Sequence, residues 1–320
     1  MKTVAIIHKD LPEIGTYPPS YAPAYASLYA QGRRRGLDFL EASAYGWDDA
    51  RGVFMAVRTP EGGILESFRP DVVWHKCSGF NAFTFQLARA YGPAFINGLD
   101  VLATARDKYA TYRRFSTLMP RTLLLSEALS DPSAVDSWAG DKIVVKPRTG
   151  LGGEGVRCLA KLGLVEGTKD IAAVSGAWVV QEWMDSSCGI PGVVDGVHDL
   201  RTVIIGGEAA FHSLRSPKSG DFRCNVSAGG SLMDFEPGAR PVPRGVLDIV
   251  ETVVRALGRD GAYSVDCAAD ASGRVYLGEV NNAPGLKVSS PDGAEAQEKL
   301  QARFHGMLCD LFVSVAAKAL

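Results

Sequence analysis

Glu279 and Asn281 stand at the end of a strand-like stretch, YLGEVNNAPGL, immediately before a turn. Side chains two positions apart on a strand point to the same face, so these two project together. The stretch AYSVDCAAD lies just upstream, and we expect the two stretches to pair as a hairpin that puts Asp266 opposite. Two carboxylates and an amide oxygen are hard ligands that suit Mg²⁺ held together with water and phosphate oxygens. Alternatively, the same residues simply end a strand and begin a turn.

A second candidate site is the glycine-rich stretch KIVVKPRTGLGGEGVRC. We expect a strand that ends near Lys146, a loop that contains Gly152 and Gly153, and then a second strand. Glycines let a backbone approach a ligand closely and aim N–H groups at anionic oxygens, while the lysine supplies a positive charge. The lysine precedes the glycines and no helix pattern follows, so this is not a Walker loop. Taken alone, a glycine-rich hairpin of this kind is more often simply a flexible turn.

Two arginines and an apolar strand complete the candidate chemistry. Arg201 in HDLRTVIIGGE and Arg223 in SPKSGDFRCNVSAGG are predicted to lie close together, where guanidinium groups can bind phosphate or carboxylate. The alternative for either arginine is a solvated surface position. The stretch WVVQEWMD is an apolar strand that breaks into polar residues, and backbone groups at its edge could contact an adenine. An ordinary edge strand has the same pattern.

The elements that must position these residues fall into two regions. Roughly the first hundred residues alternate short apolar strands with helical patterns, which predicts a mostly parallel, doubly wound α/β sheet. Antiparallel strands predominate beyond about residue 120, which predicts an α+β region. Within it, VPRGVLDIVETVVRAL has apolar residues three and four positions apart and is predicted to be a core helix. Residues 297–320 are predicted to form an amphipathic helix.

Several further predictions follow from local patterns. TARDKYATYRRFSTL is predicted to be one helix with its charges on one side, and PRTLLLSE a strand. His75 and His212 lie in apolar strands, which favours core or cleft histidines over metal ligands. The aromatic loop of residues 17–25 either lines a cleft or is simply a packed loop.

The composition excludes several classes of protein. A chain of 320 residues with 46% hydrophobic residues can bury a large core, usually in two or three domains. Lys and Arg number 34 against 36 Asp and Glu, so the balance does not indicate binding to nucleic acid or to an anionic membrane. The six cysteines include no CxxC pair, which predicts reduced thiols in a cytoplasmic protein. We expect neither a signal peptide nor a membrane span.

Taken together, six short motifs resemble those of the ATP-grasp superfamily, in the branch that contains glutathione synthetase and the ribosomal-protein glutamate ligases. The motifs are ARDK, KPRTGLGGEGV, VVQEWM, HDLR, GDFRCN and GEVNNAPGL, and they occur in the family's order. The resemblance implies an ATP-grasp fold with an N-terminal doubly wound pre-ATP-grasp domain at residues 1–102. It also implies a small lobe with a glycine-rich lid at residues 103–185 and a large C-terminal lobe with the metal site at residues 186–320.

The resemblance implies which residues contact ATP. Lys108 and Lys146 would both reach the phosphates, beneath a lid in which Gly152 and Gly153 lie nearest. The side chain of Gln181 would face the adenine amino group. The backbone of Glu182 and Met184 would face the ring edge, and Asp199 would contact the ribose.

The remaining motif residues match the metal ligands and the groups that act on the reacting atoms. Asp266, Glu279 and Asn281 correspond to ligands of two Mg²⁺ ions, with Mn²⁺ as an alternative. Arg223 would stabilise the transferring phosphoryl group and the acyl phosphate. Arg201 would orient the carboxylate or the same phosphate, and Asn225 would support both arginines.

The function implied is ATP-dependent ligation of a carboxylate to an amine through an acyl phosphate, on small amino-acid or peptide-like substrates, in a chain able to form a homo-oligomer. The alternatives are a modifier of a ribosomal peptide or protein and a non-catalytic nucleotide-binding module. Residues 186–196, SSCGIPGVVDG, depart from the family pattern as an insertion that could shape an acceptor site. Small residues, VSAGG, also replace the family's basic position after Asn225.

Overall fold

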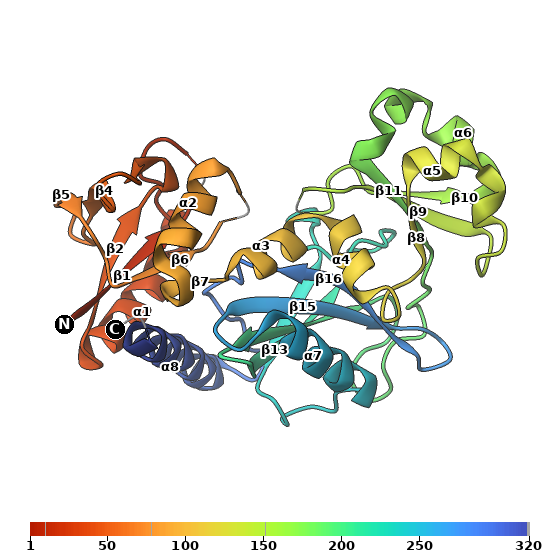
Figure 1. Cartoon of the computed structure of the whole chain (residues 1–320). Helices are drawn as coiled ribbons and strands as arrows, with labels where there is room; N and C mark the ends of the chain where they lie inside the picture. The colour runs from red at the N-terminus through yellow and green to blue at the C-terminus, as the bar shows by residue number, and fades with distance from the viewer. Residues whose placement is uncertain (10, 78, 151, 319–320) are drawn as a thin grey trace.

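Three β-sheets, each built from its own stretch of chain, form the framework of the described residues (Figure 1). The computed structural model describes residues 1–9, 11–77, 79–150 and 152–318. The first sheet lies at one end of the molecule and the second, smaller sheet at the other end, with the third between and below them.

The first sheet combines a parallel centre with an antiparallel edge. Its strand order is β3-β4-β2-β1-β6-β7, with β5 paired to β4, and β1 pairs in parallel with both β2 and β6. The strands are β1 (Lys2–Ile7), β2 (Leu37–Ala42), β3 (Trp47–Asp48), β4 (Val53–Arg58), β5 (Ile64–Phe68), β6 (Val72–His75) and β7 (Phe95–Ile96), with helices α1 (Ala22–Arg34) and α2 (Ala82–Tyr91). The expected α/β region is therefore confirmed, although antiparallel hairpins make its sheet mixed.

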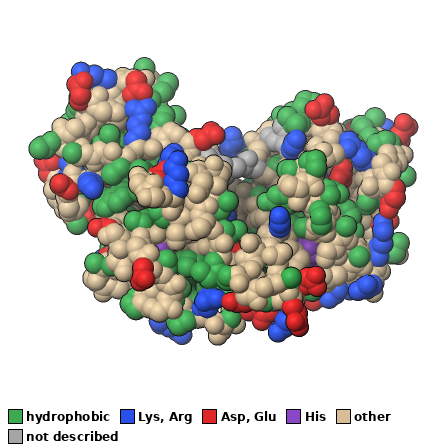
Figure 2. All heavy atoms as spheres, turned by 180° about the vertical axis from the view of Figure 1, so that it is seen from behind, with side chains coloured by type: hydrophobic (Ala, Val, Ile, Leu, Met, Phe, Trp, Pro, Cys, Tyr) green, Lys and Arg blue, Asp and Glu red, His purple; other side chains and the backbone are tan. Residues whose placement is uncertain are grey.

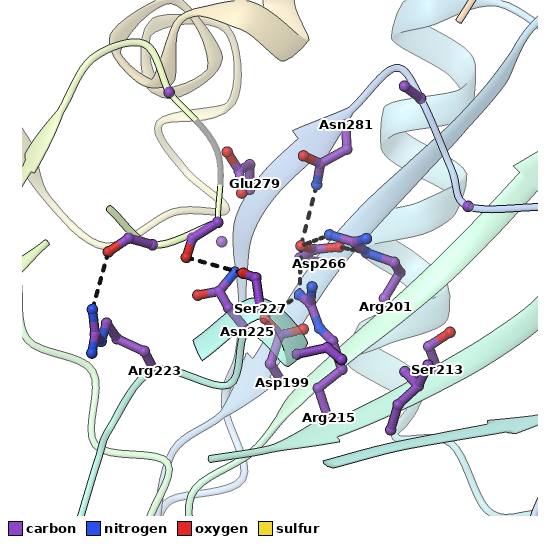
Figure 3. A pocket seen from close by; sticks show the side chains of 18 of the residues that line it. Asp199, Arg201, Ser213, Arg215, Arg223, Asn225, Ser227, Asp266, Glu279 and Asn281 are labelled. Atoms are coloured by element: carbon purple, nitrogen blue, oxygen red, sulfur yellow. Dashed lines mark hydrogen bonds and ion pairs between the residues drawn. The ribbon is translucent and has the colours of Figure 1, made fainter. Parts of the chain in front are cut away.

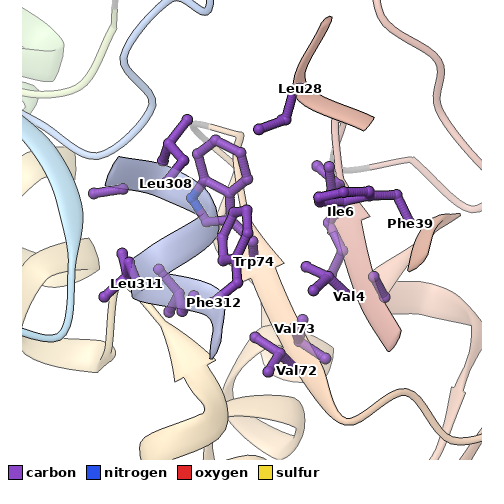
Figure 4. Packing of buried hydrophobic residues seen from close by; sticks show 14 of the residues in the cluster. Val4, Ile6, Leu28, Phe39, Val72, Val73, Trp74, Leu308, Leu311 and Phe312 are labelled. Carbon is purple, nitrogen blue, oxygen red and sulfur yellow. The ribbon is translucent and has the colours of Figure 1, made fainter. Parts of the chain in front are cut away.

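The C-terminal helix α8 (Ala294–Lys318) packs against this first sheet, although about two hundred residues separate them in sequence (Figure 4). The ring of Phe312 lies 5.4 Å from the ring of Trp74 on β6 and 5.9 Å from that of Phe39 on β2. All three rings are buried. The two ends of the chain therefore share one hydrophobic core.

The second sheet has four strands in the order β10-β9-β11-β8. They are β8 (Thr122–Leu124), β9 (Lys142–Pro147), β10 (Arg157–Ala160) and β11 (Trp178–Glu182), with helices α5 (Leu125–Ser130) and α6 (Leu164–Gly167) beside them. The prediction that PRTLLLSE is entirely a strand was wrong, because a helix begins at Leu125. The carboxylate of Glu127 accepts a hydrogen bond from the Leu124 N–H at 2.8 Å, and Leu125 and Ala128 are buried on the inner face of the helix.

The predicted single helix over TARDKYATYRRFSTL is two helices, α3 (Leu99–Arg106) and α4 (Lys108–Phe115). Asp107 breaks the helix because its backbone is extended and its carboxylate accepts hydrogen bonds from the N–H groups of Tyr109 and Ala110. The break makes Lys108 the first residue of α4.

The third sheet is antiparallel throughout, in the order β14-β13-β12-β15-β16. Its strands are β12 (Asp199–Ile205), β13 (Glu208–Ser216), β14 (Ser231–Phe235), β15 (Ala262–Ala269) and β16 (Val275–Asn281). The predicted core helix is α7 (Arg244–Leu257), which packs against this sheet. The register puts Asp266 opposite both Arg201 on β12 and Glu279 on β16, which confirms the predicted hairpin.

Shorter elements connect these layers. The 3-10 helices are Pro19–Tyr21, Ala44–Gly46, Gly92–Ala94, Pro132–Val135, Lys161–Gly163, Lys169–Ala177 and Val226–Ala228.

His75 and His212 are buried in their strands, as predicted, and burial lowers the pKa of each to about 4. Within the described ranges, no helix combines the length and apolar character needed to cross a bilayer. Seen from behind, the surface is hollowed between its two upper lobes (Figure 2).

Candidate functional site

A cavity of about 610 Å³ lies between the second and third sheets, with Tyr21 as its lining residue from the N-terminal region, and it adjoins a smaller cavity of about 190 Å³. Every residue predicted for the site lines one of the two. The larger cavity takes Lys108, Lys146, Gly152, Gly153, Asp199, Arg201, Arg223, Asn225, Asp266, Glu279 and Asn281. The smaller takes Gln181, Glu182 and Met184, and Asp199 and Asp266 line both.

Asp266 is the centre of a buried network of charges on the floor of the larger cavity (Figure 3). Arg201 grips its carboxylate with two hydrogen bonds of 2.7 Å, because β12 and β15 pair these residues directly. Arg215 donates to Asp266 Oδ2 at 2.7 Å and to Asp199 Oδ2 at 2.5 Å. Burial alone would raise the pKa of Asp266, but the two guanidinium groups outweigh it and hold that pKa well below its usual range.

Glu279 and Asn281 project into the cavity beside this network, as strand alternation predicts (Figure 3). Asn281 Nδ2 donates to Asp266 Oδ2 at 3.2 Å, which leaves the amide oxygen as the group that can bind a metal ion. The Glu279 carboxylate lies 3.5 Å from Lys108 Nζ. These two oxygen donors fit Mg²⁺, whereas the Asp266 oxygens are occupied by N–H donors in this structure. No group of three or more His, Cys, Asp or Glu side chains suited to a metal ion occurs among the described residues.

Lys108 at the start of α4 and Lys146 near the end of β9 both line the larger cavity. Asp107, which caps α4, also forms an ion pair with Arg148, and the Lys108 N–H donates to the Arg148 carbonyl at 2.9 Å. The start of α4 is thus tied to the strand end that carries Lys146. Lys146 Nζ donates to Gln181 Oε1 at 2.8 Å, and burial lowers its pKa to about 8 despite an opposing effect of Glu279.

The glycine-rich loop between β9 and β10 lies against the loop that follows β13. Arg223 donates to the Gly153 carbonyl at 3.4 Å, and Ser227 donates to the Gly152 carbonyl at 3.4 Å (Figure 3). Gly153 has φ of +75°, and a Cβ built there would lie 2.6 Å from Asn225 Oδ1. Only glycine therefore fits this approach without a shift of its neighbours.

Residues 107–296, more than half of the chain, match the family described as the prokaryotic glutathione synthetase ATP-grasp domain. The chain belongs to this family. The match confirms that the chain is an ATP-grasp protein, as the resemblance implied.

Two relatives and one solved structure illustrate the range of similar proteins. This ATP-grasp chain is 28% identical over 228 residues to a probable alpha-L-glutamate ligase of Parasynechococcus marenigrum, a match that covers 70% of the chain and 45% of that protein. It is 26% identical over 240 residues to a D-alanine–D-alanine ligase of Gloeobacter violaceus, covering 71% of the chain and 77% of that protein. The D-alanine–D-alanine ligase from Bacillus anthracis complexed with ATP has a similar fold, with a TM-score of 0.58, 13% identity, and coverage of 99% of this chain and 98% of that one.

The predicted adenine contacts of the ATP-grasp chain lie at the smaller cavity, where two side chains are already engaged. Gln181 accepts from Lys146 and donates to Thr122 Oγ1 at 2.8 Å. The Glu182 carboxylate accepts two hydrogen bonds from Arg121. The contact of Gln181 with an adenine amino group stays a prediction, and its observed partner is Lys146.

The insertion of residues 186–196 lies on the side of the smaller cavity. Ser186 lines that cavity, and none of the insertion's residues lines the described part of the larger one. His198 holds the end of the insertion, since its Nδ1 pairs with the Gly196 carbonyl and its Nε2 accepts from the Ala269 N–H. That the insertion shapes an acceptor site stays a prediction, and its cavity-lining residue, Ser186, belongs to the smaller cavity.

Two residues of the site were missed by the sequence analysis. Arg215 bridges two carboxylates, and Asp107 positions Lys108. A signal existed for Asp107, since Asp before Lys at a helix start is a capping pattern. None existed for Arg215: a register shift between Val203 and Ile204 places it opposite Asp199, whereas counting back from the turn of the β12–β13 hairpin would place Leu214 there. Of the aromatic loop, Tyr21 lines the larger cavity, whereas Tyr17 and Tyr25 stack on each other 4.0 Å apart.

Proposed function

We propose that this protein is an ATP-dependent ligase that joins a carboxylate to an amine through an acyl phosphate and releases ADP and phosphate. The observation that carries the proposal is the convergence of opposite charges on one cavity: two lysines and a glycine-rich loop on one side, and Glu279 and Asn281 on the other. A triphosphate needs cations and backbone N–H groups, and its metal ion needs oxygen ligands. The family membership of residues 107–296 supports the same activity.

The nucleotide would lie with its phosphates in the larger cavity and its base in the smaller one. Lys108 and Lys146 would bind the phosphates beneath Gly152 and Gly153. The backbone of Glu182 and Met184 would face the base, together with Gln181. Asp199 Oδ1 is buried and has no hydrogen-bond partner among the described residues, which suits it to accept from a ribose hydroxyl.

Glu279 and Asn281 would hold Mg²⁺, with Asp266 as a further ligand once a guanidinium group withdraws from one of its oxygens. We propose two ions, with Mn²⁺ able to replace Mg²⁺. An ion held by these residues would supply charge neutralisation for the phosphates and help to align the transferred group.

The chain's own residues would then serve two displacements. In the first, a carboxylate oxygen bonds to the γ-phosphorus, the bond from that phosphorus to the β–γ bridging oxygen breaks, and ADP leaves. In the second, an amine nitrogen bonds to the acyl carbon, the bond from carbon to the phosphate oxygen breaks, and the amine's proton passes to solvent. Arg223 and Asn225 would face the transferring phosphoryl group. Arg201 would act by holding Asp266, which it grips in this structure.

The glycine-rich loop would exclude water from the acyl phosphate, which water would otherwise hydrolyse. Its contacts with Arg223 and Ser227 link lid position to the reacting end of the cavity. We propose small amino-acid or peptide-like substrates, since the space left beside a nucleotide in a cavity of about 610 Å³ is limited.

The test is acceptor-dependent ADP formation from ATP with pools of amino acids and dipeptides, followed by mass measurement of the product. Hydroxylamine in place of the amine reports the first displacement alone, as a hydroxamate. Replacing either Lys146 or Glu279 by Ala should reduce ADP formation to background, because each removes a charge from the phosphate site. Near-normal turnover by either variant would contradict the assignment of the site.

A further inference from the structure

One side chain of the larger cavity is presented by an unusually well-anchored stretch of backbone, residues 286–289. Leu286 and Val288 are fully buried in the core shared by α8 and the first sheet, so Lys287 between them points the other way and lines the cavity. The Leu286 carbonyl accepts a hydrogen bond of 2.6 Å from the Gln301 amide nitrogen, and the Val288 N–H donates to the Gln301 amide oxygen at 3.1 Å. Gln301 thus holds the backbone on both sides of Lys287.

Two further contacts extend this anchoring. His305, fully buried on α8, pairs with the Leu286 carbonyl at 3.2 Å and with Ser27 of α1 at 3.1 Å. On the other side, the Ser289 N–H donates to Asp234 Oδ2 at 2.6 Å, while the Ser289 carbonyl accepts from the Asp234 N–H at 2.8 Å. The Lys287 backbone is held from both sides, and its side chain is exposed to the cavity.

Lys287 differs from the other cations of the cavity in having no partner. Six basic side chains line its described part, and five of them bind a group of the protein. Those five are Lys108 with Glu279 and Gly150, Lys146 with Gln181, Arg201 with Asp266, Arg215 with Asp199 and Asp266, and Arg223 with Asp221. Lys287 makes no hydrogen bond or ion pair with any described residue. An anion that enters the cavity therefore meets this ammonium group without displacing a protein partner.

The position of Lys287 indicates which anion it meets. The phosphates and the carboxylate under activation must lie together near Lys108, Glu279 and Arg223, the groups suited to transferred charge. Lys287 belongs instead to the wall formed with Tyr21, whose hydroxyl lies beside Gly285, and with the Ser213–Asp234 pair. That wall is left for the second substrate, the amine.

We propose that Lys287 binds the non-reacting carboxylate of the amine substrate, so that this substrate is a free amino acid or a short peptide with a free C-terminus. The inference rests on the ligase function proposed above and adds the class of the acceptor. An ammonium group that binds this carboxylate also orients the amine for attack on the acyl carbon.

The experiment compares wild-type enzyme with Lys287→Met and Lys287→Arg, using ADP release with matched amines: each active amino acid or dipeptide and its C-terminal amide. Lys299→Met, which removes an exposed lysine of α8 outside the cavity, is the control. Wild type and the control should prefer the free carboxylate. Lys287→Met should raise KM for the free acid by about tenfold to a hundredfold, the value of a hydrogen bond to a charged group, and abolish the preference over the amide. Lys287→Arg should retain part of the preference for the free acid over the amide.

Hydroxylamine separates this inference from the proposed function. Hydroxamate formation by wild type establishes ligation without any carboxylate on the amine, and its absence with every acyl donor tested defeats the function itself. If hydroxamate forms and Lys287→Met leaves the acid-to-amide preference intact, only the inference on Lys287 fails. It also fails if Lys287→Met raises KM for acyl donors bearing a second carboxylate, or for ATP, while the amine preference is unchanged.

Discussion

At the scale of single residues, the chemistry of the cavity depends on how each charge is compensated. Lys146 has an amide oxygen as its hydrogen-bond partner, whereas Asp266 has two guanidinium groups. The neutral amide does not compensate for the cost of burying the lysine's charge, so Lys146 loses its proton at a lower pH than usual. The two guanidinium groups outweigh the cost of burying the carboxylate and keep Asp266 ionised.

The lowered pKa of Lys146 predicts a pH limit on ATP capture. A lysine whose pKa falls to about 8 is charged below that pH and neutral above it, so kcat/KM for ATP should decline as pH rises through about 8. In the pH profile of kcat, the corresponding decline should occur at a higher pH, because bound phosphates favour the protonated form of Lys146. Lys146→Arg should remove this decline, since a guanidinium stays charged. A wild-type kcat/KM that is flat to pH 9.5 would contradict the prediction.

Arg215 is predicted to support stability as well as the site. Its side chain is 8% exposed and neutralises two carboxylates, so Arg215→Met should lower the free energy of unfolding by about 3 kcal/mol, the effect of leaving buried charge unpaired. Urea unfolding measures the change. The matched control is Arg255→Met, which breaks an exposed pair with Glu251 and should cost less than about 0.5 kcal/mol. Equal losses in the two variants would refute the special role of Arg215.

At the scale of elements, the proposed lid is a hairpin loop whose glycines allow contact with the loop after β13. The β9–β10 pairing fixes the base of the hairpin through Arg157 opposite Val145. The tip can approach Asn225 only because Gly153 lacks a Cβ. The residue types of the tip therefore permit this close contact, while the strands set the direction of the hairpin.

Gly153→Ala is predicted to impair the lid without unfolding the protein. The added Cβ would meet Asn225 Oδ1 at 2.6 Å, and φ of +75° costs a residue with a Cβ about 1–2 kcal/mol. ADP release should fall about tenfold or more if that strain opposes closure, with little change in the thermal midpoint. Gly163→Ala is the control, since its Cβ would meet nothing within 4 Å and its φ is −92°. Normal turnover by Gly153→Ala would show that closure does not need this contact.

At the scale of the whole molecule, the first sheet is attached to the third next to the candidate metal ligands. Asn97, which follows β7 and is fully buried, donates to the carbonyls of Ala262 and Asn282 and accepts from the Ala262 N–H. Asn282 in turn donates to the Cys77 carbonyl at 2.8 Å. The residue directly after Asn281 is thus held by the first sheet, which couples the N-terminal region to the metal end of β16.

Asn97→Ala is predicted to weaken this attachment. It leaves buried backbone groups without partners and places alanine at φ of +64°, so the free energy of unfolding should fall by about 2–4 kcal/mol. ADP release should fall further than stability alone explains, because the end of β16 loosens. Asn97→Gly separates the causes, since glycine accepts the backbone angle but lacks the hydrogen bonds. If Asn97→Gly behaves as wild type in unfolding and turnover, backbone strain rather than the side chain explains the alanine variant.

Local sequence determined much of the site, because its motifs depend on short-range geometry. The alternation of strand side chains predicted that Glu279 and Asn281 share a face, and a hairpin with a short turn predicted Asp266 opposite them. The glycine-rich loop after Lys146 could likewise be predicted from its residue types. The same local reasoning failed at Asp107 and Leu125, where a side-chain cap outweighed helix or strand periodicity.

Tertiary structure alone decided the contacts between distant segments. No local pattern indicates that α8 belongs to the core of the first sheet, that Gln181 binds Lys146, or that Gln301 holds the backbone beside Lys287. Periodicity states which face of an element is apolar but not which distant element covers it. The inference about the amine substrate depends on knowing which distant element covers which face, since Lys287 reaches the cavity only because helix α8 packs behind it.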